Sequence, residues 1–409
     1  MVTRTKRILF VENGIGYGGA VICMRHLVRA LNRDKYEPIV VTGRSGGPYA
    51  GLADDATWLS ISDRRIDIST LRRTLERYRW PDQIPALRAI LLQLLARLDD
   101  VANFVPFFLQ FVWTILRLHP DIVHTNNEPL CNRAALIAAK LLRIPVVAHV
   151  RGDQSGSRSM KWLFRLPDHF IPVSRWIAES IARVGVPTRQ STLIYDGIDF
   201  ERLDRNADGT AFRAAHGIPR DAFAVGLPGI LIAWKGQKLF LEAAKALAAE
   251  FPDMFFVIVG GTPEECRPFE QELHEFVAQT GLQDRVVFTG HIADMSATYN
   301  GLDIVVSAST AQEPLGIVVV EAMIMGRPVV APRHGGAMEI VENERTGLLF
   351  APNDAGALVD AIRRFRNDAA FRDAVAVSGR AQILETFSII RNARQVEEVY
   401  RALLEGPSG

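Results

Sequence analysis

Short apolar runs alternate with longer amphipathic stretches along the first half of the chain. Six runs of strand length are apolar or β-branched, at residues 7–12, 36–42, 121–124, 145–150, 169–173 and 192–195. Residues 20–31 and 129–142, which lie between such runs, repeat apolar positions with the period of a helix. Short buried strands that alternate with helices predict βαβ units and a parallel sheet.

The second half of the chain repeats this alternation. Its strand-like runs lie at residues 224–227, 229–232, 255–259, 285–288, 303–306, 328–331 and 347–350. Its helical patterns lie at residues 237–250, 264–279, 316–325, 355–366 and 371–386. We therefore predict an α/β protein of two Rossmann-like, doubly wound domains that face each other across a cleft. Ligands of such sheets bind beyond the carboxyl ends of the strands.

The domain boundaries are predicted from a polar stretch at residues 203–221, which is the best candidate for a linker. We assign residues 1–200 to an N-terminal domain and residues 201–385 to a C-terminal domain. A helix in residues 386–409 is expected to pack back on the N-terminal domain. The length of 409 residues agrees with two domains of similar size.

The composition is that of an ordinary globular protein, with 48% hydrophobic and 23% charged residues. The three cysteines lie far apart, which excludes a disulfide scaffold and a cysteine-rich zinc site and favours a reducing compartment. The apolar run at residues 8–11 is too short for a signal peptide. Residues 1–200 carry 27 Lys and Arg against 18 Asp and Glu, a net charge of +9, whereas residues 201–409 have a net charge of −8. This asymmetry suits either attraction between the two domains or an anionic membrane or acceptor at the first domain.

The most apolar stretch, residues 101–116, contains Pro106 and no charged residue. A bilayer span needs about 20 apolar residues, so we expect this stretch to be too short to cross a membrane and to form a buried helix. Six arginines lie upstream of it, at positions 64, 65, 72, 73, 77 and 79. Arginines beside apolar helix faces are typical of contacts with a membrane surface. We therefore predict a membrane-facing region at residues 64–118, whose apolar bulk includes Phe107, Phe108 and Trp113.

A glycine-rich segment, residues 14–19 (GIGYGG), follows the first predicted strand and precedes a predicted helix. Gly14, Gly16 and Gly19 have the spacing of the G-x-G-x-x-G fingerprint, but Gly18 adds a further glycine. The second strand ends without an acidic residue for a ribose, so NAD binding is disfavoured. The backbone N–H groups of such a loop suit a phosphate. A plain tight turn is the alternative.

The strongest pattern is two glutamates eight positions apart, in residues 313–321 (EPLGIVVVE). Glu313 is expected in a loop after a strand, and Glu321 in the second turn of the following helix. The start of that helix would present N–H groups to an anion, those of Leu315, Gly316 and Ile317. A carboxylate repels phosphate but accepts hydrogen bonds from hydroxyl groups. The pattern predicts a site for a sugar hydroxyl, a diphosphate and a ribose hydroxyl, with two solvated glutamates on an ordinary helix as the alternative.

Two neighbouring segments strengthen this interpretation. Lys235-Gly236 supplies a cation after a predicted strand, and Gly335-Gly336 supplies a second glycine loop. This ordered set resembles the retaining glycosyltransferases of family 4, which have the GT-B fold. The resemblance spans nearly the whole chain, through residues 14–19, 195–199, 235–236, 257–261, 288–291, 313–321 and 335–341.

The resemblance implies a nucleotide-diphosphate sugar as donor, bound by the C-terminal domain, and an acceptor bound by the N-terminal domain. Glu313 would contact hydroxyls of the transferred sugar, and Glu321 would hold the ribose. Lys235 would bind the diphosphate together with backbone groups of Gly18, Gly19, Leu315, Gly316 and Ile317. The loop that contains His291 and Ile292 would lie against the base.

Two positions depart from the pattern of the family. Ile230 stands where the family usually has an arginine, five residues before the lysine, which removes one cation from the diphosphate site. Arg151 stands where the family often has a histidine, and His149 lies two residues earlier. Alternate residues of a strand share a face, so His149 and Arg151 are both candidates for the reaction centre. A purely structural His149 is the alternative.

We expect transfer of a hexosyl group to an acceptor hydroxyl with retention of the anomeric configuration. The chain contains no D-x-D pattern, so we expect no metal ion and no further cofactor, with Lys235 and helix dipoles stabilising the leaving diphosphate. A lipid-linked or saccharide acceptor in polysaccharide or lipopolysaccharide assembly is expected by analogy, with a cytoplasmic location, peripheral on the inner face of the membrane. A nucleotide-sugar epimerase of the same fold and a non-catalytic nucleotide-sugar-binding protein are the alternatives. Nucleic acid is not an expected partner.

Overall fold

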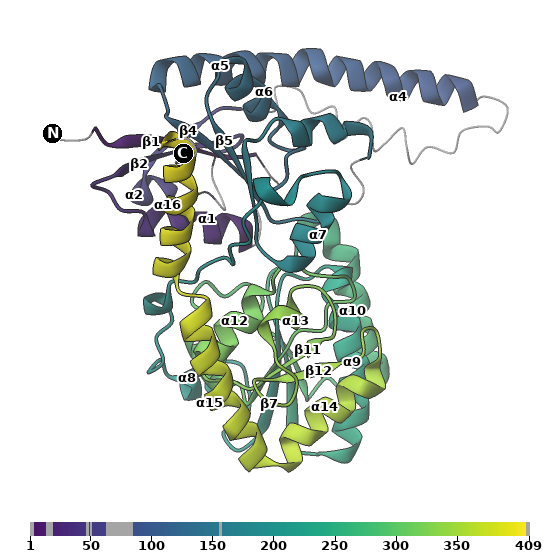
Figure 1. Cartoon of the computed structure of the whole chain (residues 1–409). Helices are drawn as coiled ribbons and strands as arrows, with labels where there is room; N and C mark the ends of the chain where they lie inside the picture. Colours follow the sequence, from purple (N-terminus) through teal and green to yellow (C-terminus); the bar gives the residue numbers. More distant parts are fainter. Residues whose placement is uncertain are drawn as a thin grey trace. The chain divides into compact units, whose positions relative to one another are not determined.

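The computed structural model describes residues 4–13, 19–45, 49, 51–62, 85–154 and 158–405. The chain divides into two compact units (Figure 1). The first unit consists of Met1–Val173, Ile177–Ile194 and Ala393–Gly409, and the second consists of Ser174–Trp176 and Tyr195–Asn392. Each unit contains one six-stranded sheet, and every strand pair that the structure describes is parallel.

The sheet of the first unit has the strand order β3-β2-β1-β4-β5-β6. Its strands are β1 (Lys6–Glu12), β2 (Tyr36–Thr42), β3 (Thr57–Ser60), β4 (Ile122–Asn126), β5 (Val146–Val150) and β6 (His169–Pro172). The central strands β4 and β5 are buried along their whole length. Strands buried on both faces are typical of a parallel sheet that helices cover from both sides.

Helices pack on both faces of this first sheet. On one face, α1 (Gly19–Ala30) and α16 (Ile389–Glu405) contribute Leu27 and Val396 to a core that includes Ile8 and Ile122 of the strands. On the other face, α5 (Val105–Leu118) and α6 (Arg133–Leu141) contribute side chains such as Phe111 and Leu136. The alternation of side chains along each strand supplies one apolar row to each of these two cores.

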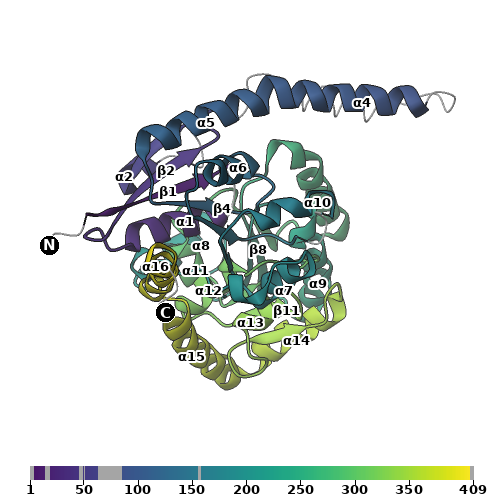
Figure 2. The ribbon, with the colours of Figure 1, turned by 45° about the horizontal axis from the view of Figure 1, so that its top comes forward.

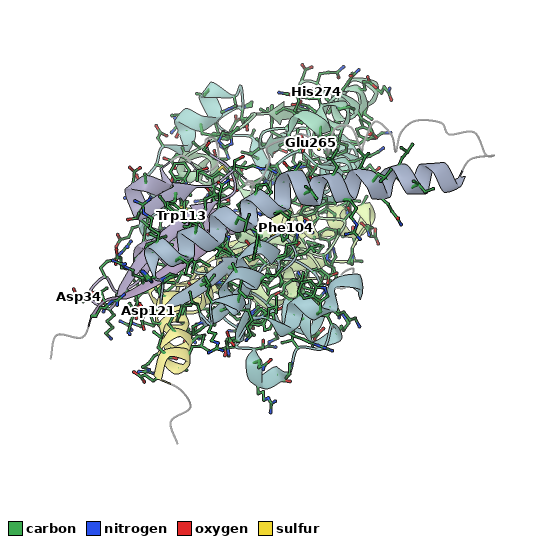
Figure 3. All side chains as sticks on the ribbon, turned by 90° about the horizontal axis from the view of Figure 1, so that it is seen from above. Asp34, Phe104, Trp113, Asp121, Glu265 and His274 are labelled. Atoms are coloured by element: carbon green, nitrogen blue, oxygen red, sulfur yellow. The ribbon has the colours of Figure 1, made fainter. Side chains whose placement is uncertain are left out.

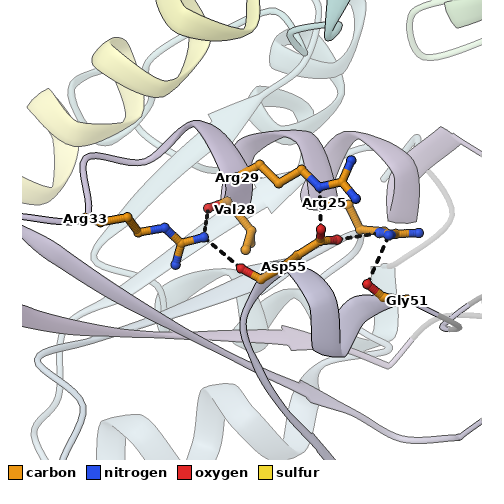
Figure 4. Close-up of polar contacts among 6 residues, drawn as sticks. All are labelled: Arg25, Val28, Arg29, Arg33, Gly51 and Asp55. Carbon is orange, nitrogen blue, oxygen red and sulfur yellow. Dashed lines mark hydrogen bonds and ion pairs between the residues drawn. The ribbon is translucent and has the colours of Figure 1, made fainter. Parts of the chain in front are cut away.

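A short helix, α2 (Leu52–Asp55), is tied to α1 by arginines (Figure 4). The buried carboxylate of Asp55 accepts a hydrogen bond from Nε of Arg25 at 2.7 Å and another from Nε of Arg29. Arg33 donates to the backbone carbonyl of Asp55 at 2.7 Å. The four-residue spacing places Arg25 and Arg29 along one side of α1, so that the carboxylate of Asp55 ties α2 to this helix.

The helices α4 (Pro85–Asp99) and α5 and the π-helical turn η2 (Asp100–Phe104) between them form one continuous rod (Figure 2). Within it, Ile90–Leu118 is 29 residues long and, by length and composition alone, apolar enough to cross a membrane. The apolar helix is therefore longer than residues 101–116, because it continues through η2 and past Pro106. The expectation that residues 101–116 do not cross a membrane stays a prediction. Core helices of soluble proteins meet the same criteria, and the arginines at positions 64–79 lie outside the described residues.

The sheet of the second unit has the order β12-β11-β10-β7-β8-β9. Its strands are β7 (Phe223–Pro228), β8 (Met254–Val259), β9 (Val286–Phe288), β10 (Ile304–Val306), β11 (Val329–Pro332) and β12 (Leu348–Phe350). One face carries α9 (Gln237–Glu250), α10 (Arg267–Thr280) and α14 (Ala355–Asn367). The other carries α8 (Gly209–Ala215), α11 (Ser296–Gly301), α12 (Ile317–Ile324), α13 (Ala337–Ile340) and part of α15 (Ala369–Thr386).

Both sheets have the same strand order when each is counted from its own first strand, 3-2-1-4-5-6. The winding therefore reverses between β1 and β4 in the first unit and between β7 and β10 in the second. In open α/β sheets this switch point is where ligands bind. The predicted α/β class with parallel sheets is confirmed.

Two predicted strands are not strands in the structure. Residues 192–195 form no strand, and only a single bridge joins Phe170 to Ser191. Residues 229–232 form bends rather than a strand, because Gly229 has a φ of 153° and turns the chain after β7.

The expected linker at residues 203–221 contains α8 and belongs to the second unit. Asp208 caps this helix by accepting hydrogen bonds from the backbone N–H groups of Thr210 and Ala211. The side chain of Phe212 is buried in the core of the unit. Phe212 and Ile218, which are both buried in this core, thus anchor a segment whose composition is that of a loop.

Candidate functional site

The second unit brings Lys235 and Glu313 together at its switch point. Lys235 ends the short turn η6 (Ala233–Lys235) after β7, and Glu313 lies in the loop after β10. Nζ of Lys235 lies 2.8 Å from Oε2 of Glu313, and the two side chains are only 16% and 12% exposed. The hydroxyl of Ser309 donates to the other carboxylate oxygen, Oε1. We call Lys235, Glu313 and the start of α12 the lysine site.

Two glycines allow the loops of the lysine site to approach each other closely. Gly236 has a φ of 77°, and a Cβ there would lie 1.8 Å from the carbonyl oxygen of Ala308. Gly336 donates its N–H to the carbonyl of Glu313 at 2.8 Å, and a Cβ there would lie 2.4 Å from Cα of Leu315. Only glycine fits such contacts between backbones. The loop of Glu313 is therefore held by the glycine pair that follows β11.

The start of α12 lies directly after this loop. Gly316 precedes the helix with a φ of 96°, and Ile317 is its first residue. Leu315 is buried in the core, which anchors the helix start, and the first turn contains no acidic side chain. Unpaired N–H groups and the positive end of the helix dipole at such a position attract an anion. The backbone groups of Leu315, Gly316 and Ile317 thus lie next to the ion pair that Lys235 and Glu313 form.

Glu321, in the second turn of α12, has a fixed orientation. The hydroxyl of the buried Tyr299 donates a hydrogen bond to Oε2 of Glu321 at 2.7 Å. Burial raises the pKa of the Glu321 carboxyl, and the hydrogen bond from Tyr299 opposes that rise. Tyr299 lies on α11 and was missed, because nothing in its sequence neighbourhood marks it as a partner of Glu321.

The predicted base-binding loop follows β9. Gly290 accepts a hydrogen bond from the N–H of Gly260 at 3.0 Å, so this loop is tied to the loop after β8. His291 is exposed, and Ile292 packs against the core between the sheet and α12. The loops after β7, β8 and β9 are bonded to one another in sequence, since Leu231 donates to the carbonyl of Gly261.

The first unit gathers polar residues at the carboxyl ends of β1, β4 and β5. Alternation along each strand places these residues on the face covered by α1 and α16, in line with apolar residues such as Phe10 and Ile122. We call this set the histidine network, and it comprises Glu12, His124, Asn126, His149, Arg151 and Tyr400. All six residues are buried.

Asn126 is the hub of one half of the histidine network. Its amide donates to the carboxylate of Glu12, and its carbonyl oxygen accepts from Nη1 of Arg151. The amide of Asn127 donates to both oxygens of Glu12, at 2.7 and 2.8 Å. A buried carboxylate and a buried guanidinium are thus joined through one neutral side chain, and the carboxylate has Asn127 as a second donor.

The predicted residues His149 and Arg151 are in contact. Nη2 of Arg151 lies 3.4 Å from Nδ1 of His149. Burial, followed by the charge of Arg151, holds the pKa of His149 well below its ordinary value. His124 and Tyr400 belong to the same network and were missed, because their contacts join β4 to a helix 276 residues away.

The glycine loop of the first unit is described only in part. Gly19 is the first residue of α1. Gly18 and the rest of residues 14–18 lie outside the described residues. The predicted phosphate contact of this loop therefore stays a prediction.

Family models match both halves of the chain. Residues 17–202 match glycosyltransferase family 4, and residues 208–382 match glycosyl transferases group 1. The chain is 34% identical over 246 residues to the lipopolysaccharide core biosynthesis mannosyltransferase LpsB of Rhizobium meliloti, a match that covers 60% of this chain and 68% of that protein. It is 26% identical over 290 residues to the alpha-D-kanosaminyltransferase of Streptomyces kanamyceticus, covering 65% and 73%.

Solved structures show the same arrangement of elements. Anabaena Alr3699/HepE in complex with UDP and glucose matches with a TM-score of 0.79 at 24% identity, covering 97% of this chain and 100% of that chain. Sucrose-phosphate synthase from Thermosynechococcus elongatus matches with a TM-score of 0.75 at 21% identity, covering 98% and 99%. The two parallel sheets and these neighbours show that the fold is GT-B.

Proposed function

The chain belongs to glycosyltransferase family 4, and on that premise we propose that it transfers a hexosyl group from a nucleotide-diphosphate sugar to a hydroxyl of an acceptor. One observation carries this proposal. Lys235, Glu313 and the start of α12 lie together at the switch point of the second sheet. A cation and free N–H groups suit a diphosphate, and the adjacent carboxylate suits the hydroxyls of a sugar.

The ion pair between Lys235 and Glu313 gives each residue a role in donor binding. A diphosphate carries more negative charge than one carboxylate, so it competes with Glu313 for the amine of Lys235. Glu313 then accepts hydrogen bonds from sugar hydroxyls, while Ser309 keeps its other oxygen in place. When the donor binds, Lys235 thus exchanges Glu313 for the diphosphate, and Glu313 exchanges Lys235 for the sugar hydroxyls.

Glu321 is the proposed ribose contact. Tyr299 occupies Oε2, which leaves the second carboxylate oxygen to accept from a ribose hydroxyl. The loop with His291 and Ile292 is the proposed contact for the base. Support comes from the structures of Alr3699/HepE, which were solved with UDP and with UDP-glucose.

We propose that the reaction retains the anomeric configuration and needs no metal ion. Glu321 is assigned to the ribose, so Glu313 and Glu321 do not form the paired carboxylates of a glycosidase. The departing phosphate takes the proton of the acceptor hydroxyl on the face from which it leaves. Its charge is stabilised by the amine of Lys235 and by the start of α12, and the absence of a D-x-D pattern from the sequence supports this route.

The proposed acceptor is a lipid-linked or saccharide molecule that is used in the assembly of cell-surface polysaccharide or lipopolysaccharide. Relatives named as lipopolysaccharide core mannosyltransferases, from Rhizobium meliloti and Rhizobium leguminosarum, support this choice. The net charge of +9 in residues 1–200 suits an anionic acceptor or membrane.

An exposed apolar ridge supports a peripheral position at the cytoplasmic face of a membrane. One row of large apolar side chains follows the rod of α4, η2 and α5, at Ile90, Leu94, Leu98, Val101, Val105, Leu109, Trp113 and Leu116. Steps of three and four residues place this row on one side of the helix, over about 39 Å. Trp113 lies on this rod (Figure 3) and is 60% exposed. The guanidinium of Arg117 lies 5.3 Å from the centre of its ring.

The opposite side of α5 decides how this ridge meets a bilayer. Phe107, Phe111 and Ile115 are buried against the first sheet. The rod therefore lies along the membrane surface as long as the unit is folded, with the ridge in the interface. Phe107 belongs to the core and not to the predicted membrane-facing bulk, whereas Trp113 belongs to the ridge.

Sedimentation with liposomes tests the ridge. Replacing Leu109 and Trp113 by glutamate should lower partition into phosphatidylglycerol-containing liposomes at least tenfold, because burying each such side chain contributes about 1.5–3 kcal/mol. Val377→Glu is the matched control, since Val377 is 73% exposed on α15 and lies outside the ridge. If the double variant sedimented with liposomes as much as the unchanged protein, a bilayer would not be the partner of the ridge. The same would follow if the unchanged protein formed a dimer without lipid and the double variant were a monomer.

Calorimetric titration with UDP, UDP-glucose and GDP-mannose tests the donor site, followed by transfer assays with membrane glycolipid extracts. Lys235→Met should weaken binding of the preferred nucleotide sugar at least tenfold and abolish transfer. Lys238→Met is the matched control, because Lys238 pairs with Glu272 on the exposed surface of α9. Binding of no nucleotide sugar, equal binding by Lys235→Met, or conversion of the donor sugar without an acceptor would contradict the proposal.

A further inference from the structure

The histidine network contains a chain of three rings that the proposed transfer has not explained. The hydroxyl of Tyr400, on α16, lies 2.7 Å from Nδ1 of His124. Nε2 of His124 lies 3.2 Å from Nδ1 of His149. All three residues are fully buried, with 0% exposure. The last helix of the chain is therefore connected through β4 to the carboxyl end of β5.

Arg151 determines the direction of the hydrogen bonds in this chain. Its guanidinium can only donate, because it has no acceptor atom and stays protonated in proteins. Nη2 of Arg151 faces Nδ1 of His149 at 3.4 Å. Nδ1 of His149 must therefore carry a lone pair, and the proton of a neutral His149 ring must lie on Nε2.

The same argument fixes the next two groups. Since Nδ1 of His149 accepts, Nε2 of His124 must carry the proton between the two rings. A neutral His124 then has a lone pair on Nδ1, which accepts from the hydroxyl of Tyr400. Burial, followed by the charge of Arg151, lowers the pKa of His124 well below its ordinary value, so both rings are neutral at pH 7.

Other charged and titratable groups around the chain agree with this assignment. Tyr36 packs edge-on against Tyr400 with ring centres 5.6 Å apart, and Glu397 lies on the same helix as Tyr400. Burial raises the pKa of Tyr400 well above its ordinary value, with smaller contributions from Tyr36 and Glu397. The phenol of Tyr400 therefore keeps its proton and can donate it in a hydrogen bond.

We propose that Tyr400, His124 and Arg151 are positioning residues that hold His149 in the tautomer with its proton on Nε2, so that His149 serves the transfer as a hydrogen-bond donor and not as a proton acceptor. This role rests on the proposed function, whereas the tautomer rests on contacts within the first unit. Any oxygen that meets Nε2 of His149 must accept. The acceptor hydroxyl must then lose its proton to another group, which agrees with the departing phosphate as the base.

Nuclear magnetic resonance of protein labelled with 15N-histidine tests the tautomer directly. Between pH 6 and pH 8, His124 and His149 should each show a protonated Nε2 and an unprotonated Nδ1. Single histidine substitutions assign the signals. A proton on Nδ1 of His149, or a charged His149 ring at pH 7, would overturn the proposal whatever the donor sugar is.

Two tyrosine variants separate the chain from packing in the same core. Tyr400→Phe keeps the ring but removes the hydroxyl, so the 15N signal of Nδ1 of His124 should move towards that of a nitrogen without a donor. Tyr36→Phe is the matched control, because its hydroxyl contacts the carbonyl of Glu397 at 3.4 Å and not a histidine. Equal shifts in the two variants, or no shift in Tyr400→Phe, would show that Tyr400 does not donate to His124.

Kinetics of the full-length enzyme then distinguish a donor from a base. The amide nitrogen of a glutamine can take the place of Nε2, so His149→Gln should lower kcat/KM by no more than about tenfold, and His149→Ala by more. Loss of a general base would lower both variants by about 10²–10⁴-fold, and a common loss of that size would overturn the donor role. If no nucleotide sugar is transferred, the proposed function fails while the tautomer is still decided by the spectra.

Discussion

The two units share one strand order, but the polar groups at their switch points differ in burial and in how they are paired. In the second unit, Lys235 and Glu313 form a direct ion pair whose members keep some exposure to solvent. In the first unit, Glu12 and Arg151 are more deeply buried and are joined through the neutral side chain of Asn126. The same topology thus supports one pair that a ligand can separate and one network that is part of the core.

This difference follows from what surrounds each switch point. The loops of the lysine site contain glycines that bring backbones together and leave Lys235 at the surface of the unit, beside Trp234. The histidine network is covered by α1 and by α16, which contributes Tyr400. The Lys235–Glu313 pair keeps 16% and 12% side-chain exposure, so water can reach the partner that remains after one is removed, whereas a fully buried charge without its partner is costly. Removal of a partner of the charged groups should therefore mainly affect activity in the second unit and mainly stability in the first.

The largest expected effect is a loss of stability in Asn126→Ala. The substitution leaves the buried Glu12 and Arg151 without their common partner, so the free energy of unfolding should fall by about 3 kcal/mol or more. Urea denaturation followed by circular dichroism measures it. Asn300→Ala is the matched control, because the half-buried Asn300 donates only to the carbonyls of Arg205 and Ala207. Equal losses in the two variants would mean that the network is no more than an ordinary set of side-chain contacts.

Glu313→Ala should lower transfer by about a hundredfold, which corresponds to about 2.7 kcal/mol. The free energy of unfolding should fall by less than in Asn126→Ala, because the two side chains keep 16% and 12% exposure and Lys235 can still be solvated. Steady-state kinetics and urea denaturation on the same preparation measure both quantities. Glu272→Ala removes the partner of Lys238 on the surface and serves as control. A variant that unfolds as readily as Asn126→Ala but retains transfer would reverse the contrast between the units.

The contrast also explains which parts of the molecule the sequence could predict. Glu313 and Gly316 are close in sequence, and Lys235 follows the neighbouring strand, so the convergence of carboxyl ends brings them together. Most strands and long helices were predicted because each contains an uninterrupted apolar pattern. The lysine site therefore required only local patterns and the general rule for parallel sheets.

The histidine network required information that no local pattern contains. His149 and Arg151 could be singled out because the family resemblance points to the end of β5, whereas nothing marks His124, inside β4, as more than a core residue. Tyr400 reaches it only because α16 returns to the first unit. Which face of the strand a histidine occupies depends on register, and one residue of slip would place it on the other side.

Tyr299→Phe should have a smaller effect, confined to the donor. Removing the hydrogen bond to Glu321 raises the pKa of that carboxyl further, since the bond opposes the rise caused by burial. The carboxylate form is then lost at a higher pH, so KM for the donor should rise about fivefold at acid pH with little change in kcat. A series of KM values between pH 5 and pH 8 measures this shift.

Tyr195→Phe is the matched control for this pH dependence. Tyr195 also donates to a glutamate of the second unit, Glu339, at 3.0 Å. That pair lies outside the lysine site, so the KM profile should not move. A shift of equal size in both variants would show that Tyr299 acts through general stability and not through the ribose contact.

The smallest expected effect is a gain, in Ile230→Arg. The backbone at this position is fixed, because the carbonyl of Ile230 accepts from the side chain of Gln237 at 2.9 Å. A guanidinium there adds a partly solvated charge beside the diphosphate, which should lower KM for the donor by about threefold. The gain should shrink as salt is raised, since exposed charges are screened. Ile390→Arg, at an exposed isoleucine of α16, is the matched control and should leave KM for the donor unchanged. An equal fall of KM in this variant would mean that the added charge acts through the net charge of the protein. The diphosphate would then not lie beside residue 230.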